Sequence, residues 1–145
     1  MFNKKVNWVI KELILFIIGG LIYFIIENIF RGFGNSHWTM IIVGGICFVL
    51  VGLINEFFDW NDSLIMQTIV SAFIILSIEF FAGILLNIIL KLNIWDYSNN
   101  LFNLLGQICL KSYIYWLILS PIGIIIDDYI RYFLFKEEKP HYKLI

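Results

Sequence analysis

The sequence predicts an all-α fold, a polytopic membrane four-helix bundle with a short interfacial or re-entrant segment before its last span. Of the 145 residues, 61% are hydrophobic and only 14% are charged, whereas a soluble domain is about half apolar and about a quarter charged. The charges gather at the ends, with four in residues 1–12 and eight in residues 127–145. Between them lie apolar runs that reach the roughly 20 residues a membrane-crossing helix needs.

This composition also excludes several classes of protein. So apolar a sequence does not fit a soluble globular enzyme or a disordered chain. At a net charge of −1 it also lacks the excess of basic residues with which proteins bind nucleic acid. The sequence contains no Walker loop, no Gly-x-Ser-x-Gly and no His-Glu-x-x-His motif. We therefore expect one transmembrane domain over residues 1–145 that is not an enzyme and holds no cofactor or metal.

Four spans are expected at about residues 13–30, 38–58, 64–90 and 112–133, with the interfacial segment at about 95–110. The third is longer than a bilayer requires, so we expect it to tilt or to extend beyond the lipid. Lys111 and Pro121 interrupt the last apolar region. A simpler division makes residues 101–126 one span and leaves the acidic pair that follows outside it.

The positive charges predict the orientation, because cytoplasmic loops are rich in lysine and arginine. Seven such residues lie near the termini (Lys4, Lys5, Lys11, Arg131, Lys136, Lys139, Lys143) and three near the outer loops (Arg31, Lys91, Lys111). Four spans place both termini on one side, so we expect both in the cytoplasm. Four tryptophans fall near the expected interfaces: Trp8, Trp38, Trp60 and Trp95. The charged tail, residues 136–141, is expected to be a solvated end.

Each expected helix has one face of small residues and a carboxylate, at spacings that share a helical face. These faces are Gly19, Tyr23, Glu27 and Arg31; Gly45, Gly52 and Glu56; Ala72, Glu79, Gly83 and Asn87; and Ser120, Gly123, Asp127 and Arg131. Glu27 and Arg31 are correctly ordered for an intrahelical ion pair. The remaining positions are mostly Ile, Leu, Phe and Val, which suit lipid.

A bundle with these faces inward gathers polar side chains that we expect to line a substrate or ion pathway: Glu27, Arg31, Glu79, Asn87, Asp127, Asp128 and Arg131, with Glu56 and Gln107 joining according to depth. The same faces could instead serve only to hold the four helices of the fold together. Two arginines cannot neutralise five acids, and a buried carboxylate without a cation takes a proton or a metal ion. Glu79 has no cation within a helical turn, so it is the expected proton- or cation-responsive group.

Other candidate residues carry weaker signals. His37 before the second span is expected to be an interfacial hydrogen-bonding residue, and Cys47 and Cys109 are expected to be packing residues. Asp127 and Asp128 resemble acidic pairs that hold magnesium for phosphate chemistry. Adjacent carboxylates at a helix end are far more often structural, and no second acidic motif with ligand spacing accompanies them.

Most of residues 19–135 resemble a bacterial membrane family, the ABC-transporter type IV or CmpB-like proteins. The resemblance rests on Glu27, Arg31-Gly32, Ser36-His37-Trp38-Thr39-Met40, Gly44-Gly45, Asn55-Glu56, Glu79, Gly83, Asn87, Trp95-Asp96-Tyr97-Ser98-Asn99, Phe102-Asn103, Gly106-Gln107-Ile108-Cys109, Trp116, Ser120 and Asp127-Asp128-x-x-Arg131. One departure is Leu101, where the family usually has proline. The polar segment 95–107 is expected to fold in as a cap on the bundle, through Trp95, Asp96, Ser98 and Asn103.

The resemblance implies a small bacterial inner-membrane protein of the permease kind. A nucleotide-binding domain is missing from this sequence, so an ATPase would have to be a separate polypeptide. The first functional hypothesis is a permease-like transport component with a polar intramembrane cluster. The alternative is a non-transporting scaffold or accessory subunit that binds a partner membrane protein. Expected partners are the lipid bilayer, a second copy, or such an ATPase or membrane partner, and not nucleic acid.

Overall fold

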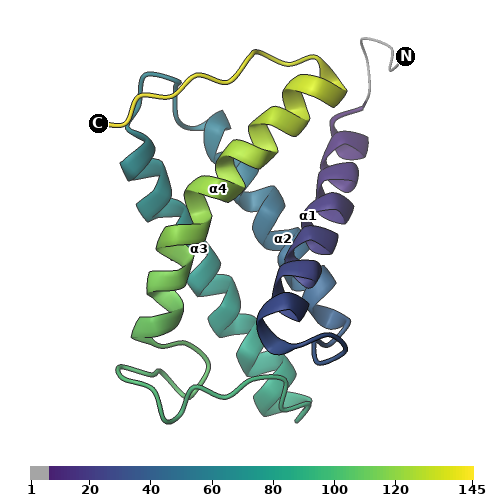
Figure 1. Ribbon diagram of the computed structural model, residues 1–145, viewed down its shortest axis with the longest axis vertical. Helices are drawn as coiled ribbons and strands as arrows, with labels where there is room; N and C mark the ends of the chain where they lie inside the picture. The colour runs from purple at the N-terminus through teal and green to yellow at the C-terminus, as the bar shows by residue number, and fades with distance from the viewer. Residues whose placement is uncertain (1–6) are drawn as a thin grey trace.

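Four helices that alternate in direction make up the fold in the computed structural model (Figure 1). They are α1 (Trp8–Arg31), α2 (Thr39–Gly52) with the 3-10 turn η1 (Leu53–Glu56), α3 (Leu64–Gly83) with the π-helical turn η2 (Ile84–Ile89), and α4 (Leu110–Phe135). The structure describes residues 7–145, without the side chains of residues 55 and 56. No strand forms within that range, so the predicted all-α fold is confirmed.

Three of the helical stretches are long and apolar enough to cross a membrane: Trp8–Arg31, Leu64–Ile89 and Leu110–Phe135. α2 is equally apolar but has only 14 residues. The expected second span, residues 38–58, therefore corresponds to α2, η1 and the start of the turn that follows. The alternative span at residues 101–126 is wrong, because α4 begins only at Leu110.

Local side-chain chemistry determines where three helices begin. Asn7 and Ser63 each accept a hydrogen bond from a backbone amide in the first turn, at 3.3 and 3.4 Å. Cys109 and Ser112 cap α4 reciprocally, since the Cys109 amide donates to Ser112 Oγ and the Ser112 amide donates to Cys109 Sγ. Cys109 is buried as expected, and it also has this capping role.

Glycines allow α1 and α2 to pack backbone against backbone. A methyl group at Gly20 would lie 2.3 Å from the carbonyl oxygen of Ile41, and one at Gly45 would lie 2.7 Å from that of Phe16. α3 packs along α4 in turn, and α2 contacts both of them. Small residues on facing helices are the usual means of close approach in membranes.

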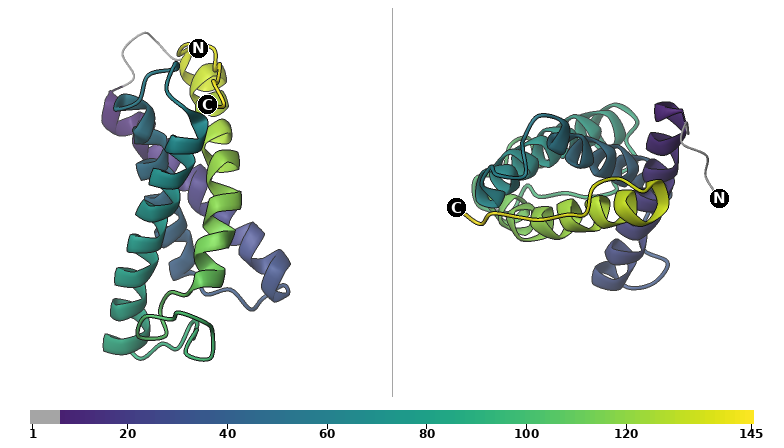
Figure 2. Two further views of the ribbon diagram at one scale, coloured as in Figure 1. Left: turned by 90° about the vertical axis from the view of Figure 1, so that its left-hand side faces the viewer. Right: turned by 90° about the horizontal axis from the view of Figure 1, so that it is seen from above.

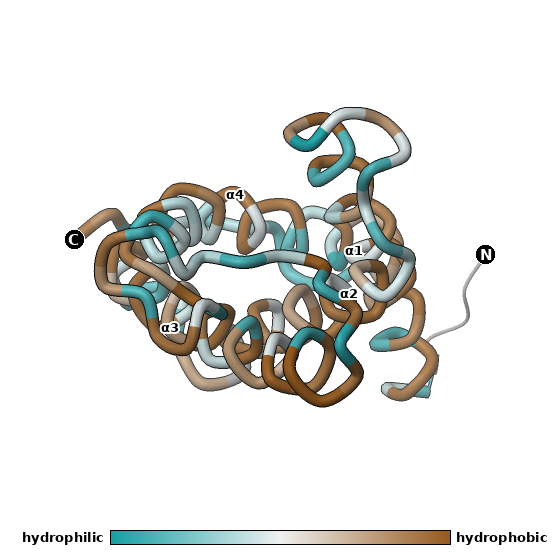
Figure 3. The backbone as a smooth tube through the Cα atoms, turned by 90° about the horizontal axis from the view of Figure 1, so that it is seen from below, coloured by the Kyte–Doolittle hydropathy of each residue, from teal (hydrophilic) through white to brown (hydrophobic). Residues whose placement is uncertain are grey.

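Hydrophobic residues predominate along the helices (Figure 3), and many of their large side chains are exposed, as expected for helices in lipid. Large side chains such as Ile17, Phe73, Phe81 and Ile118 are more than half exposed. A soluble protein rarely exposes so much contiguous apolar surface. Many of the small and polar residues that the sequence pattern selected are buried, including Gly19, Glu79 and Asp127.

Two non-helical segments cross the ends of the bundle (Figures 1 and 2). Residues 90–109 cover the end where α3 stops and α4 starts. The tail, residues 136–145, runs back across the other end to α3, where the Leu64 amide donates to the Lys143 carbonyl at 2.8 Å. Residues 136–141 are mostly exposed, as expected, but the tail is also anchored to the bundle, because Tyr142 donates to Asp128 at 2.6 Å and Trp60 donates to Glu138 at 3.1 Å.

Candidate functional site

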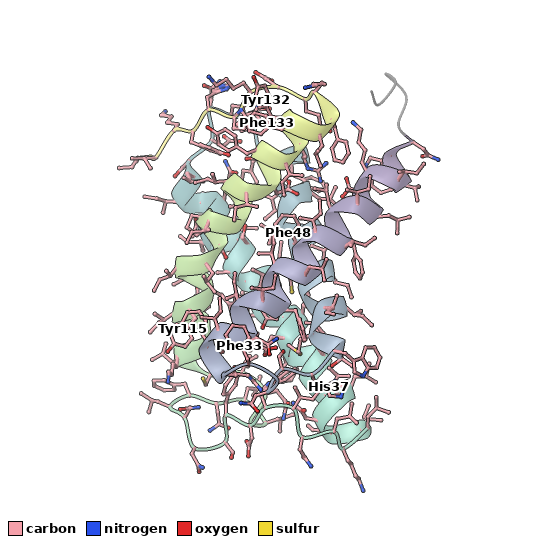
Figure 4. All side chains as sticks on the ribbon, turned by 45° about the vertical axis from the view of Figure 1, so that its right-hand side comes forward. Phe33, His37, Phe48, Tyr115, Tyr132 and Phe133 are labelled. Atoms are coloured by element: carbon pink, nitrogen blue, oxygen red, sulfur yellow. The ribbon has the colours of Figure 1, made fainter. Side chains whose placement is uncertain are left out.

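The polar side chains do not form the single interior cluster that the sequence predicted. They separate into an Arg131 triad at the end covered by the tail and, toward the opposite end, a Glu79 group that adjoins a Glu27 pair and the neighbouring loop, with Glu27 close enough to interact electrostatically with Glu79. Figure 4 shows these two ends, with Tyr132 and Phe133 near one, His37 near the other, and Phe48 between them. Spacing along one helix predicts which residues share a face of that helix. It does not predict the depth in the bundle at which the faces of different helices meet.

The Arg131 triad joins α1 to α4. Arg131 Nε donates to Asp127 Oδ2 at 2.7 Å, and its two terminal nitrogens donate to the two carboxylate oxygens of Glu12 at 3.1 and 3.2 Å. The side chains of the triad are at most 10% exposed. Asp128, beside them, contacts Tyr142 of the tail. The triad is therefore a buried, hydrogen-bonded ionic connection.

Sequence reasoning missed Glu12, because it counted acids only within the expected spans. A signal was present, since Glu12, Leu15 and Gly19 follow one another at steps of three and four and extend the polar face of the first helix by two turns. All three are buried. The predicted balance of five acids against two arginines therefore omits one buried acid, Glu12.

The Glu27 pair lies at the opposite end of α1. Arg31 Nε lies 3.3 Å from Glu27 Oε1, which confirms the predicted intrahelical ion pair. The Ser36 hydroxyl donates to Glu27 as well. Arg31 Nη1 donates to the carbonyl of Ile94 at 2.9 Å and so ties α1 to the segment that follows η2. His37 contacts Thr39 Oγ1 through Nδ1 at 2.8 Å, so it makes a hydrogen bond as expected.

The Glu79 group differs from both ionic clusters. Glu79 is 8% exposed, and the groups that donate to its two oxygens are neutral. The Tyr97 hydroxyl of the loop donates to Oε1 at 3.2 Å, and the Trp116 indole of α4 donates to Oε2 at 2.9 Å. Salt bridges of the described residues engage Glu12, Glu27, Asp127 and Glu137 but not Glu79. The expectation that Glu79 lacks a cation thus agrees with the described contacts.

The Asn87–Gln107 pair secures the loop. Asn87 Nδ2 donates to Gln107 Oε1 at 2.9 Å, and the Ile94 amide donates to Asn87 Oδ1 at 2.7 Å. The Trp95 indole donates to the Gln107 carbonyl at 2.9 Å. Trp95 is 7% exposed, so its ring is packed inside the protein. Gly83 leaves room for Gln107, because a methyl group there would lie 2.5 Å from Gln107 Oε1.

The rest of the loop is held by short-range hydrogen bonds. The Ser98 amide donates to Asp96 Oδ1 at 2.8 Å, and hydrogen bonds from Ser98 lower the pKa of Asp96. Asn103 donates to the carbonyl of Ser98 at 3.0 Å and accepts from the amide of Gly106 at 3.2 Å. The expected cap residues Asp96, Ser98 and Asn103 therefore stabilise the fold of the loop itself, while Trp95 and Gln107 attach it to the bundle.

Replacing Asn87 by leucine is expected to release this loop without unfolding the bundle. The change removes the acceptor of the Ile94 amide and the donor to Gln107 Oε1, at a cost of about 1–3 kcal/mol for each group left unsatisfied. Faster amide hydrogen exchange at residues 94–107, with unchanged exchange in α1, is the expected result. Uniformly faster exchange in all helices would show instead that Asn87 stabilises the whole fold.

The acidic pair Asp127–Asp128 lies beside Arg131 and Tyr142, as described above. Within residues 7–145, no three His, Cys, Asp or Glu side chains lie together as metal ligands would. The side chain of Glu56, a predicted pathway residue, lies outside the described residues. Lys4 and Lys5, which supported the predicted orientation, lie outside them too.

A cavity of about 100 Å³, partly open to the outside, lies between α1, α2 and α4. Its wall includes three small residues of the inward faces: Gly19, Gly44 and Gly123. Tyr23 and Trp116 also line it, and their rings stack with centroids 5.8 Å apart. The cavity is apolar in character, and the ionic clusters at the two ends of the bundle do not line it.

Residues 14–140 match the family described as "Putative ABC-transporter type IV". The chain belongs to this family. No curated protein and no solved structure matches the chain. Together with the three membrane-compatible helices, the match indicates that this member of the type IV family is a multi-pass membrane protein. The family itself is described as one of ABC transporters. A transporter family also favours a protein that is not an enzyme.

Proposed function

We propose that this chain is a permease-like transport component and that Glu79 is its proton- or substrate-responsive group. The observation that carries the proposal is the Glu79 group: a buried carboxylate whose oxygens accept hydrogen bonds from the neutral Tyr97 and Trp116. Burying an unpaired charge is so costly that such a group responds to proton supply or to a cation. Ionisable groups within membrane spans are functional by default.

Glu79 connects the elements that a transport step would have to move. It lies on α3, its two donors lie on α4 and on the loop, and Asn87 on the same helix holds Gln107. A change in the charge of Glu79 therefore alters the strength of its bonds to both donors at once. We propose that this links the state of the carboxylate to the position of the loop cap.

The two ionic clusters support the bundle on either side of this group. Arg131 and Arg31 each pair with acids of the described residues, so we propose that they are structural anchors rather than steps of a pathway. Glu27, Arg31, Asp127, Asp128 and Arg131 would then position Glu79 and the loop without contacting substrate. Four helices enclose a narrow passage, so a wider one requires a second copy or a partner.

Glu79→Gln tests the proposal. The amide keeps the shape of the carboxyl group but cannot titrate, so a proton-dependent flux is expected to lose its pH dependence. Purified protein in liposomes, assayed with ion- and proton-sensitive dyes, measures this effect. Lys11→Met serves as the control, because Lys11 forms a partly exposed ion pair with Glu137 at the surface. Flux equal to that of empty liposomes in both wild type and Glu79→Gln would contradict the proposal.

A second candidate function is an accessory subunit that binds a partner membrane protein. The observation favouring it is that Arg31 and Arg131 are paired with acids within the protein and that the described cavity is apolar. In that case the variant Glu79→Gln changes assembly with the partner and leaves membrane conductance unchanged. Crosslinking in native membranes that recovers no stoichiometric partner would count against this function.

We propose the bacterial cytoplasmic membrane as the location, with both termini in the cytoplasm. Support comes from the end of the bundle that carries the start of α1 and the tail, where Lys11, Arg131, Lys136, Lys139 and Lys143 gather. Cytoplasmic ends of membrane proteins are rich in such cations. If the chain works with an ATPase, we propose that the two meet at this end.

A further inference from the structure

The two ends of the bundle differ in how they connect to Glu79. At the end covered by residues 90–109, here called the loop face, polar side chains reach from Glu79 toward the surface. The Tyr97 hydroxyl donates to Glu79 at 3.2 Å, and the Tyr97 side chain is only half-buried. Tyr97 also lies close enough to Arg31 to interact with it electrostatically, and the Arg31 side chain is 31% exposed. Glu79 therefore has a polar connection to the loop face.

Toward the end covered by the tail, here called the tail face, Glu79 adjoins an apolar layer instead. Four buried side chains from three helices form this layer, which we call the tail-side cluster: Val51, Leu64, Ile75 and Ile124. Ile75 lies one helical turn from Glu79, and Ile124 lies two turns from Trp116, in each case toward the tail face (Figure 1). Tyr142 of the tail packs against the cluster as well. Apolar constrictions of this kind exclude water.

Polar atoms on the tail side of Glu79 are dry. Gln67 Oε1, Ser120 Oγ and Asp127 Oδ1 have no hydrogen-bond partner among the described residues, and solvent does not reach them. All three residues are buried, and they lie on α3 and α4 between the level of Glu79 and the tail face. Buried polar atoms without a partner are costly and uncommon in folded proteins. Their number on this side indicates an interior that is polar enough to hold water and is closed to it.

The closure is tight at α2 and leaves space beside it. Gly52 brings α2 so close to α4 that an added methyl group would lie 2.5 Å from the Asp127 carboxylate. Next to this contact, Val51 and Ile75 both line the hollow of about 100 Å³ between α1, α2 and α4. Close-packed side chains can rearrange only where space is available. Two members of the tail-side cluster therefore have room to move.

We propose that this structure holds Glu79 open to the loop face alone and that the tail-side cluster is the gate on the other side. Gln67, Ser120 and Asp127 then line the closed part of the path behind the gate. When the gate opens, water bonds their unpartnered atoms, which offsets the cost of separating apolar side chains. This gate deepens the proposed function and rests on it in one respect, the role given to Glu79.

The reactivity of single cysteines with a charged, membrane-impermeant thiol reagent tests the proposal. The background carries Cys47→Ala and Cys109→Ser, and serine at position 109 keeps a capping side chain for α4. Asn99→Cys in the loop and Lys139→Cys in the tail replace exposed residues and mark the two faces, so that no orientation has to be assumed. A methanethiosulfonate that carries trimethylammonium is added to intact cells and to inverted membrane vesicles, and mass spectrometry measures the rate of modification.

Two further cysteines report on the path itself. Glu79→Cys should react from the loop face. From the tail face it should react about 10- to 1,000-fold more slowly, because a minor open state is typically populated at about 0.1–10%. Ser120→Cys replaces a single atom and removes no hydrogen bond of the described residues, so it reports from behind the gate even if Glu79→Cys does not fold. It should react slowly from both faces.

Two valine-to-alanine changes on α2 isolate the gate. Val51→Ala shortens a side chain of the tail-side cluster and should raise the tail-face rates of both reporter cysteines by about tenfold, the factor that burial of two methyl groups supplies. Val43→Ala removes the same atoms on the loop side, where Val43 packs against the buried cluster of Met40, Leu86 and Trp95. This control should leave the tail-face rates unchanged.

Several results would overturn the proposal. Equal rates from the two faces at Glu79→Cys would mean that no gate exists. Reaction from the tail face alone, or from neither face, would mean that the polar connection through Tyr97 is not an opening. A tail-face rate that Val51→Ala leaves unchanged, or that Val43→Ala raises equally, would remove the tail-side cluster as the gate. Loop-face reaction of Glu79→Cys in a chain that supports no flux would leave the gate standing and contradict the proposed function instead.

Discussion

Replacing Arg131 by methionine is expected to lower the free energy of unfolding by about 3–5 kcal/mol, because it leaves two buried carboxylates without their cation. Arg131 holds Glu12 through two nitrogens and Asp127 through a third. Methionine retains an apolar side chain of similar length, so the loss comes from the charges. Equilibrium unfolding in mixed detergent micelles, followed by circular dichroism, measures the effect.

Two further variants show whether the loss arises from uncompensated charge. Lys11→Met removes an ion pair with Glu137 whose side chains are 24% and 36% exposed, and such pairs contribute about 0–1 kcal/mol. Adding Glu12→Gln and Asp127→Asn to Arg131→Met should restore part of the stability, since neither acid of the triad is then left as a buried charge without its cation. Equal losses in the single and triple variants would mean that Arg131 acts through packing alone.

Gly20→Ala is expected to destabilise the bundle by about 1–3 kcal/mol, although alanine favours helices more than glycine does. The added methyl group would lie 2.3 Å from the carbonyl oxygen of Ile41. That oxygen belongs to the backbone of α2, so α1 and α2 must move apart along the interface that they share. Thermal unfolding in detergent measures the loss, and Gly45→Ala, 2.7 Å from the Phe16 carbonyl, should behave in the same way.

Gly123→Ala provides the matched control for this prediction. Its methyl group meets no atom within 4 Å, so only the higher helix propensity of alanine remains, worth up to about 1 kcal/mol in favour of the variant. The two substitutions are chemically identical and differ only in what surrounds the new carbon. Equal destabilisation by both would show that glycine flexibility, and not helix contact, decides stability.

Much of the fold could be predicted because the membrane makes sequence pattern informative. Lipid cannot form hydrogen bonds with backbone amide and carbonyl groups, so apolar runs that cross the membrane must be helical. The small and polar residues of these helices must then face inward. The burial of Ser120, Asp127 and Arg131 on one face of α4 follows from that rule. The pair of Glu27 and Arg31 was predictable for a similar reason, since both partners lie on one helix.

The partners that lie on different helices could not be predicted in this way. Sequence spacing relates residues within one helix, but the depth at which two helices meet depends on their tilt and on the loops between them. The contacts of Glu12 with Arg131 and of Glu79 with Trp116 both join residues of different helices. The packing of the tail residue Tyr142 against Asp128 is another such contact, hidden by the charged composition of the tail.

The sequence by itself determined that this is a helical membrane protein whose few central charges face inward, because composition and periodicity depend only on the solvent that each residue meets. Only the tertiary structure decided that these charges form separate groups at different depths. It also decided that Glu79 contacts neutral donors and that a cavity remains beside Ser120. These features depend on how far each helix is displaced along its neighbour, and glycine contacts, loop length and side-chain volume together set that displacement.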